Sequence, residues 1–208
     1  MSKIYLVYLF LLVILHMTNQ NFAQSRFDHF PEHKLPQEMS PQSNSLDPSV
    51  KKFPKMVVFD LDYTLWPLHV HDLVAPFKKI GQKVMDAKGT LIKYYRGVPE
   101  ILRYLKENKC LVAAASRTSE ILHAKQILNL INLNQYFSNK EIYPGPKTTH
   151  FESLKKATGI EYKDMVFFDD EERNSHDVSP LGVTCIHVKK GMSHAVLQKG
   201  LKQWASKN

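Results

Sequence analysis

From residue 53 onward, short continuous apolar runs alternate with longer stretches in which apolar residues recur every three or four positions. A continuous run of about 4–8 apolar residues is typical of a buried strand, and the longer period is typical of a helix with one buried side. The runs that predict strands are 56–59, 110–115, 165–168 and 183–188, with 141–143 as a shorter candidate. The stretches that predict helices are 98–108, 119–129, 148–158 and 193–204.

This alternation predicts βαβ units and therefore a mainly parallel sheet. The strands of such a sheet are buried on both sides, because the helices that connect them cover both faces. We therefore expect an α/β fold, a doubly wound parallel sheet of the Rossmann-like kind, within a domain at 53–206.

One segment interrupts the alternation. About thirty residues separate Trp66 from Gly97, and within them the sequence Asp86-Ala87-Lys88-Gly89 is typical of a hairpin turn. We call residues 67–96 the flap, because an insertion after the first strand overhangs the end of the sheet. It is too short to form a large cap domain, so we expect an accessible site.

Polar residues follow the predicted strands where each strand ends. Sites in open α/β sheets lie just outside the carboxyl ends of the strands. The residues at these ends are Asp60, Asp62 and Thr64 after the first strand, Ser116 and Arg117 after the second, Lys147 after the Pro144-Gly145-Pro146 turn, and Asp169 and Asp170 after the 165–168 strand. Two carboxylates as close as Asp60 and Asp62 repel each other unless a cation neutralises them, and hard oxygen ligands favour Mg²⁺.

Taken singly, each of these residues has a simpler interpretation. A carboxylate after a strand can cap a helix or lie in a solvated loop, and Ser116 can cap the helix that follows it. Lys147 alone is typical of a surface lysine. Their occurrence together, each at a strand end of one sheet, favours a site.

The same residues carry a family resemblance. The sequence Phe-Asp-Leu-Asp-Tyr-Thr-Leu at 59–65 resembles the first motif of haloacid dehalogenase superfamily phosphotransferases. Ala-Ser-Arg-Thr at 115–118, Lys147 and Phe-Asp-Asp at 168–170 resemble the second, third and fourth motifs. In finer detail the sequence resembles the eukaryotic magnesium-dependent phosphatases, over about residues 55–204. Residues 1–52 lie outside it.

The resemblance implies a phosphatase with Mg²⁺ as its cofactor. Asp60 is the expected nucleophile and Asp62 the expected general acid and base, with Mg²⁺ held by Asp60, the backbone carbonyl of Asp62 and the acidic pair. We favour Asp170 as the direct ligand and Asp169 as the residue that orients a metal-bound water, although the sequence leaves this choice open. Ser116, Arg117 and Lys147 are expected to bind the substrate phosphate.

The expected substrate is a phosphorylated small molecule, such as a sugar or glycated-amine phosphate, or a phosphotyrosine-containing protein. Two alternatives remain: a catalytically idle scaffold that binds phosphate, and a phosphotransferase whose acceptor is not water. The superfamily strand order also places the strands that carry Cys110 and Cys185 on opposite sides of the first strand, so we expect two free thiols.

Composition adds limits on partners. The net charge is +8, but the basic residues are scattered and form no nucleic-acid-binding motif, so we expect no nucleic-acid partner. We also expect a monomer. Residues 1–25 have the charged, apolar and small-residue order of a signal peptide or an anchor, and 26–52 is expected to be a flexible linker. The chain is therefore expected in the secretory pathway if the leader is used, and in the cytoplasm otherwise.

Several further residues are open to two interpretations. The spacing of His69 and His71 allows a second metal site on a strand, but a polar edge of the flap is favoured. Trp66, Tyr94 and Tyr95 are expected to pack in the core or the flap rather than to border the site. His150 and His176 are expected to be caps or surface residues.

Overall fold

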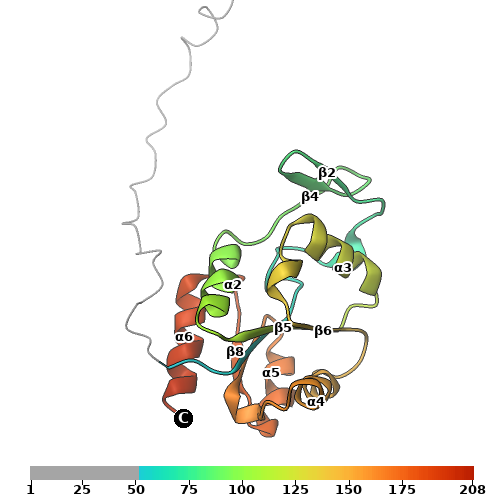
Figure 1. The fold of residues 1–208 in the computed structure, drawn as a ribbon. Coiled ribbons are helices and arrows are strands. Elements are labelled where there is room, and N and C mark those ends of the chain that lie inside the picture. The colour runs from blue at the N-terminus through green and yellow to red at the C-terminus, as the bar shows by residue number, and fades with distance from the viewer. Residues whose placement is uncertain (1–51) are drawn as a thin grey trace, which may run out of the picture. The chain divides into compact units, whose positions relative to one another are not determined.

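The computed structural model describes residues 52–208, and its centre is a five-stranded sheet in which every neighbouring pair is parallel (Figure 1). The strand order is β6-β5-β1-β7-β8. The strands are β1 (Met56–Phe59), β5 (Leu111–Ser116), β6 (Asn139–Ile142), β7 (Met165–Asp169) and β8 (Thr184–His187). The strand that ends at the paired carboxylates therefore lies in the middle of the sheet.

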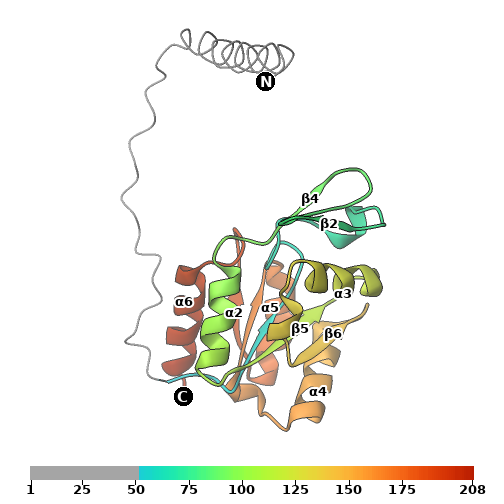
Figure 2. The ribbon, with the colours of Figure 1, turned by 45° about the horizontal axis from the view of Figure 1, so that its top comes forward.

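Helices cover both faces of the sheet, as Figure 2 shows. The helices α2 (Val98–Glu107), α3 (Ile121–Leu130) and α6 (His194–Ala205) share one apolar cluster. The helices α4 (Lys147–Thr158) and α5 (Glu172–Val178) share the other. Short 3₁₀ turns occur at Val70–Asp72, Asn134–Tyr136, Tyr162–Asp164 and Ser179–Leu181. Side chains of β1 alternate between the two clusters, as the pleat of a strand requires.

The flap contains a small antiparallel sheet of three strands, β2 (Lys78–Ile80), β3 (Lys83–Met85) and β4 (Leu91–Ile92). It stands out from the body of the domain above α3 (Figures 1 and 2). The hairpin expected around Asp86-Ala87-Lys88-Gly89 joins β3 to β4, and β2 is an additional strand. A strand of three exposed residues has no apolar pattern, so the sequence did not reveal it.

The predicted α/β fold is confirmed, and most element boundaries shift by one or two residues. Gly159 ends α4 with φ of 69°, the left-handed conformation that glycine adopts most readily. Helix α5 was not predicted, because its sequence Glu-Arg-Asn-Ser-His-Asp-Val contains a single apolar residue. The two cysteines are free, as expected, and burial raises the pKa of each thiol to about 12.

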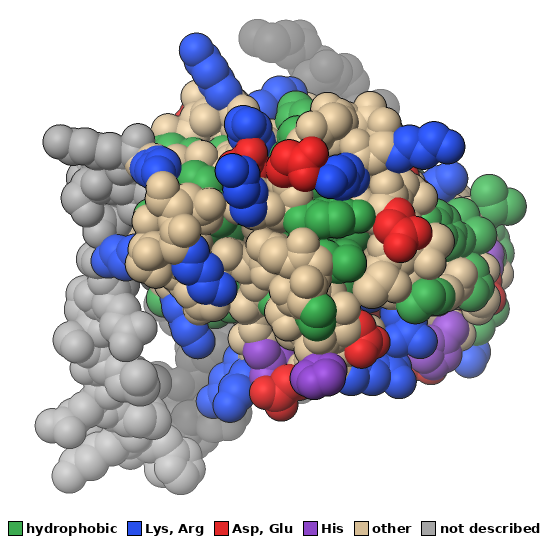
Figure 3. Space-filling view, turned by 90° about the horizontal axis from the view of Figure 1, so that it is seen from below, with side chains coloured by type: hydrophobic (Ala, Val, Ile, Leu, Met, Phe, Trp, Pro, Cys, Tyr) green, Lys and Arg blue, Asp and Glu red, His purple; other side chains and the backbone are tan. Residues whose placement is uncertain are grey.

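The predictions of a leader at 1–25 and a linker at 26–52 concern residues that, apart from Lys52, lie outside the described part of the chain. Residues 52–208 contain no helix long and apolar enough to cross a bilayer. On the face drawn in Figure 3, lysine and arginine side chains lie among acidic and neutral ones rather than in one patch.

Candidate active site

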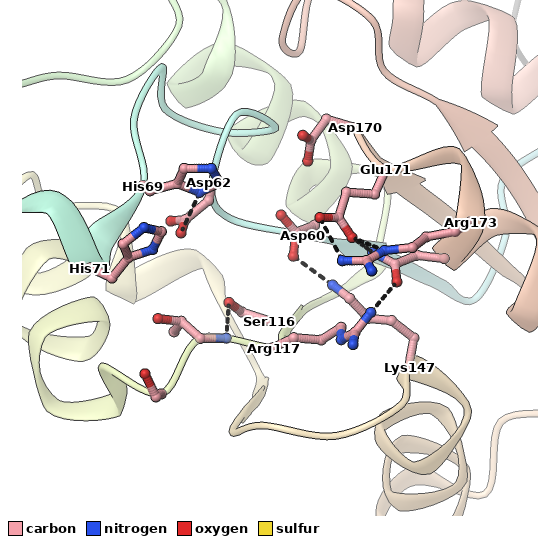
Figure 4. Close-up of a pocket in the computed structure, with 13 residues that line it drawn as sticks. Asp60, Asp62, His69, His71, Ser116, Arg117, Lys147, Asp170, Glu171 and Arg173 are labelled. Carbon is pink, nitrogen blue, oxygen red and sulfur yellow. Dashed lines mark hydrogen bonds and ion pairs between the residues drawn. The ribbon is translucent and has the colours of Figure 1, made fainter.

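The polar residues that follow the strands meet at one edge of the sheet, around a pocket of about 310 Å³. Figure 4 shows Asp60 between Lys147 and Asp170, with Asp62 turned toward His69. The residues that line the pocket are Asp60, Asp62, His69, His71, Ser116, Arg117, Thr118, Ser119, Lys147, Asp170, Glu171, Arg173 and Asn174. All the catalytic, phosphate-binding and metal-binding residues predicted from the sequence therefore line this pocket except Asp169, which is fully buried and contacts the pocket residue Lys147.

Lys147 joins three strand ends. It is the first residue of α4, after Pro146, and its side chain is only 1% exposed. Its ammonium group lies 2.5 Å from an oxygen of Asp60 and 3.1 Å from one of Asp169, and it also donates to the backbone carbonyl of Ala115. A buried lysine is rare unless its charge is paired, and here it holds β1, β5 and β7 together at their carboxyl ends.

The buried group of Lys147, Asp60 and Asp169 has one basic side chain for two acidic ones. Burial raises the pKa of Asp60 well above its usual range, and although Lys147 lowers it, the charge of Asp169 raises it again. The pKa of Lys147 is itself raised: burial lowers it, but its two carboxylate partners outweigh that effect. Lys147 favours the ionised form of Asp60, but burial and the charge of Asp169 oppose it. More positive charge at Asp60 would favour the carboxylate.

Asp62 is held in a fixed orientation beside the pocket. One carboxylate oxygen accepts a hydrogen bond from the indole of Trp66 at 2.8 Å, and the other accepts one from the backbone N–H of Val70 at 3.1 Å. His69 lies 3.5 Å from the second oxygen. Trp66 is fully buried, as expected, and its indole N–H, the one polar group of the side chain, orients Asp62.

The two acids at the end of β7, Asp169 and Asp170, occupy different environments. Asp169 is fully buried and ends the strand, whereas Asp170 faces the pocket. Thr64, also buried, donates to Asp170 at 3.3 Å and accepts from the backbone N–H of Asp170 at 3.1 Å. Burial and the charge of Asp169 raise the pKa of Asp170. The alternation of a strand explains why neighbouring residues face in different directions.

Asn174 completes the support of Asp169. Its amide nitrogen lies 3.0 Å from each carboxylate oxygen of Asp169, and its oxygen accepts from Arg117 at 3.1 Å. Its side chain is almost fully buried, at 2% exposure. Asn174 lies on α5, and because that helix has no apolar period, no pattern along the chain placed this residue at the site.

His150 contacts the backbone at the end of β5 and is not the cap or surface residue that was expected. It is fully buried, and its Nε2 lies 3.1 Å from the carbonyl of Ser116 and 2.9 Å from that of Tyr143. Its ring stacks on Tyr143. The expectation was wrong because position 150 lies on the inner face of α4, which becomes clear only once the helix is packed on the sheet. His176, in contrast, is exposed, as expected.

Residues 52–207 match the family model described as acid phosphatase. The chain belongs to the acid phosphatase family. A human relative, magnesium-dependent phosphatase 1, is 51% identical over 156 residues, which cover 74% of this chain and 89% of that protein. A HAD-like hydrolase superfamily protein of Schizosaccharomyces pombe is 41% identical over 159 residues, covering 70% and 92%.

Solved structures agree with the fold. A haloacid dehalogenase family enzyme from Bacteroides thetaiotaomicron, solved as a magnesium complex, matches with a TM-score of 0.54 at 19% identity. The match covers 71% of this chain and 100% of that one. The superfamily resemblance, the fold and the assignment as a phosphatase are therefore confirmed, and the human relative's name agrees with the expected magnesium cofactor.

The site has donors that suit a hard divalent cation. Asp60 and Asp170 present carboxylates to the same pocket, and both have pKa values raised by burial and by nearby negative charge. Within residues 52–208, no three His, Cys, Asp or Glu side chains form a preformed metal cluster. The expected set does not need one, because its third donor is the backbone carbonyl of Asp62.

His69 and His71 do not occupy a strand. His69 directly precedes the 3₁₀ turn Val70–Asp72, and the two rings stack with centroids 4.7 Å apart. They line the catalytic pocket on the side of Asp62. They are thus a polar edge of the flap, the interpretation that the sequence favoured.

Tyr95 lies on the other side of Asp170, where it lines a separate pocket with Tyr63 and Gly191.

Proposed function

We propose that this protein is a Mg²⁺-dependent phosphomonoester hydrolase that works through an aspartyl-phosphate on Asp60. The observation that carries the proposal is the buried lysine, Lys147, bonded to Asp60 at the end of the central strand. A carboxylate there can approach phosphorus, while the ammonium group and the neighbouring pocket residues offset the charge of the phosphoryl oxygens.

The first step transfers the phosphoryl group to the enzyme. A carboxylate oxygen of Asp60 forms a bond to phosphorus as the bond between phosphorus and the leaving-group oxygen breaks. Asp62, in its protonated form, gives its proton to that leaving oxygen. Bound Mg²⁺ would supply charge neutralisation between the nucleophile and the phosphate, held by Asp60, Asp170 and the backbone carbonyl of Asp62.

The second step returns the enzyme to its starting state. Asp62, now ionised, takes a proton from a water molecule, whose oxygen bonds to phosphorus as the bond to Asp60 breaks. Inorganic phosphate leaves. The hydrogen bonds from Trp66 and Val70 keep Asp62 in one orientation for both proton transfers, and Ser116 and Arg117 bind the phosphate oxygens.

The substrate class follows from access to the pocket. The flap is small and no large cap domain lies in residues 52–208, so a phosphate on a bulky carrier can reach Asp60. We therefore infer that phosphotyrosine in a protein chain is a substrate, and that phosphorylated sugars or glycated amines are small enough to be substrates as well.

The test is hydrolysis of an aryl phosphate with Mg²⁺ and with excess chelator. Wild-type turnover should disappear with chelator and return with Mg²⁺. Asp60→Asn should abolish it, whereas Asp177→Asn, an exposed acid of α5 that does not line the pocket, should leave it unchanged. Acid-quenched enzyme should carry phosphate on Asp60. If Asp60→Asn kept more than about 1% of the activity, which is less than about 3 kcal/mol of barrier, the nucleophile assignment would be wrong.

A second variant tests Asp62. A general acid matters more when the leaving group is a poor one, so Asp62→Asn should slow hydrolysis of an alkyl phosphate more than that of a nitrophenyl phosphate. Equal losses on both substrates would contradict the proton-transfer role.

A further inference from the structure

The flap carries an unbalanced positive charge. From Leu73 to Arg96 the chain has one acidic residue, Asp86. The basic residues in this segment are Lys78, Lys79, Lys83, Lys88, Lys93 and Arg96, and all are exposed. Among residues 52–208, none of these six takes part in an ion pair. Their charge is therefore directed to solvent or to a partner.

Asp86 does not neutralise them, because its carboxylate is used within the flap. One oxygen accepts from the backbone N–H groups of Lys88 and Thr90 at 2.9 and 2.7 Å, and the other accepts from that of Val74 at 3.1 Å. These bonds close the turn between β3 and β4. The single acid of the segment thus shapes the flap, while the charges of the lysines face outward.

Three of the lysines line a groove of about 300 Å³ between the flap and the end of α3. Its walls come from the flap strands and from residues 130–132 at the end of α3, and Figures 1 and 2 show these two segments facing each other. The lysines are Lys79, Lys83 and Lys93. The apolar residues Val84 and Leu91 line the same groove. We call this the flap groove.

The flap groove belongs to the folded domain rather than to a free loop. Leu73, Phe77, Val84 and Ile92 are buried in the same apolar cluster as α2 and α3. The ring of Phe77 also packs edge-on against His123 of α3, with centroids 5.2 Å apart. A positively charged surface that is held in place in this way can bind a partner without first ordering a loop.

Helix α3 links the flap groove to the catalytic pocket. Ser119, just before the helix, lines the pocket, and Leu130, its last residue, lines the groove. Eleven residues of helical rise separate them by about 16 Å. An extended peptide advances about 3.3 Å per residue, so about five residues would span this distance.

We propose that the flap groove binds an acidic segment of a phosphorylated polypeptide substrate, whose acidic residues lie about five positions from the phosphorylated one. The inference rests on the proposed function and deepens it by naming the substrate class. The lysines complement acidic side chains, and the apolar residues that line the same groove suit the carbon atoms of a peptide rather than a free sugar. A phosphorylated sugar is too small to reach both the pocket and the groove.

The decisive variant reverses the groove charge. In the full chain, Lys79, Lys83 and Lys93 are changed together to glutamate. The matched control changes Lys156, Lys163 and Lys207 to glutamate, which alters the net charge equally on exposed residues that line neither the pocket nor the groove. None of the six residues belongs to the proposed catalytic machinery, so both variants should hydrolyse an aryl phosphate within about twofold of the wild-type rate.

Two phosphotyrosine peptides then separate the outcomes. One has glutamates about five positions from the phosphotyrosine on both sides, and the other has glutamines there. The wild-type chain and the control should prefer the acidic peptide in kcat/KM by about tenfold, and the groove variant should lose this preference. The preference should also weaken in 1 M salt, where the screening length is about 3 Å. Equal kcat/KM for both peptides in the wild-type chain, or an unchanged ratio in the groove variant, would overturn the proposal.

Binding provides a readout that does not depend on catalysis. Fluorescence anisotropy of an unphosphorylated acidic peptide should show tighter binding to the wild-type chain than to the groove variant. A chain that binds this peptide but turns over no aryl phosphate would overturn the proposed function and support the groove. If the lysines instead bound phosphatidylserine vesicles while the acidic peptide showed no preference, the groove would be a lipid site and the proposal wrong.

Discussion

The edge of the sheet and the flap use lysine in opposite ways. At the sheet edge Lys147 is almost inaccessible and lies within 3.1 Å of two carboxylates, whereas the flap lysines are exposed and have no ion-pair partner within residues 52–208. A buried charge must be paired because desolvation is costly, while an exposed charge is stabilised by water. The first arrangement positions groups for chemistry, and the second is available for recognition.

The largest expected effect comes from breaking the buried group. Lys147→Ala leaves Asp60 and Asp169 without their counter-charge and should lower the free energy of unfolding by about 3–5 kcal/mol, measured by urea denaturation. Activity should fall to background. Lys155→Ala, which breaks an exposed pair with Glu161, is the matched control and should leave stability within error. A Lys147→Ala protein as stable as the control would contradict the comparison between the two regions.

The pH dependence of that variant has a definite sign. Without Lys147 the pKa of Asp60, already raised by burial, rises further in the folded state. A group whose pKa is higher in the folded than in the unfolded state stabilises the fold at low pH and loses that effect as pH rises. The stability of Lys147→Ala should therefore fall as pH rises above about 4, the unfolded value for aspartate. Its deficit relative to the wild-type chain should widen once pH passes the raised folded pKa of Asp60 in the wild type.

A smaller effect is expected at Asn174, which orients Asp169 from α5. Asn174→Ala removes two hydrogen bonds to a buried carboxylate and should cost about 1–3 kcal/mol of stability. By analogy with groups that orient metal ligands, activity should fall about 10–100-fold. Gln126→Ala on the exposed side of α3 is the control. An Asn174→Ala enzyme with full kcat/KM would show that Lys147 and the backbone N–H of Glu171 suffice to position Asp169.

The smallest expected effect is local to the flap. Burial alone would raise the pKa of Asp86, but hydrogen bonds from the backbone of Val74, Thr90 and Lys88 outweigh it, and the pKa is lowered. The stabilisation from Asp86 is therefore present above the unfolded value near pH 4 and lost as pH falls through the lower folded value. Asp86→Ala should expose the β3–β4 turn to proteolysis at pH 7, without changing aryl phosphate turnover by more than about twofold. A flap that resists proteolysis as in the wild-type chain would show that its apolar anchors suffice.

The sequence predicted the sheet and the site for the same reason. Buried strands have continuous apolar runs, and the residues after them gather at one edge because parallel strands share a direction. Asp60, Asp62, Ser116, Arg117, Lys147 and Asp170 could therefore be grouped from their positions along the chain. Asn174 could not, because it lies on a helix of seven residues without an apolar period.

By itself, then, the sequence determined the α/β class, the succession of strands along the chain and the chemistry of their ends, since these depend on local periodicity and on residue types. Tertiary structure alone decided that Lys147 pairs with two carboxylates, that His150 is buried beneath Ser116, and that three flap lysines face the end of α3. Each of these depends on the packing of segments distant in the chain, which short-range pattern does not encode. The distinction between a buried, paired lysine and an exposed, unpaired one is therefore a property of the fold.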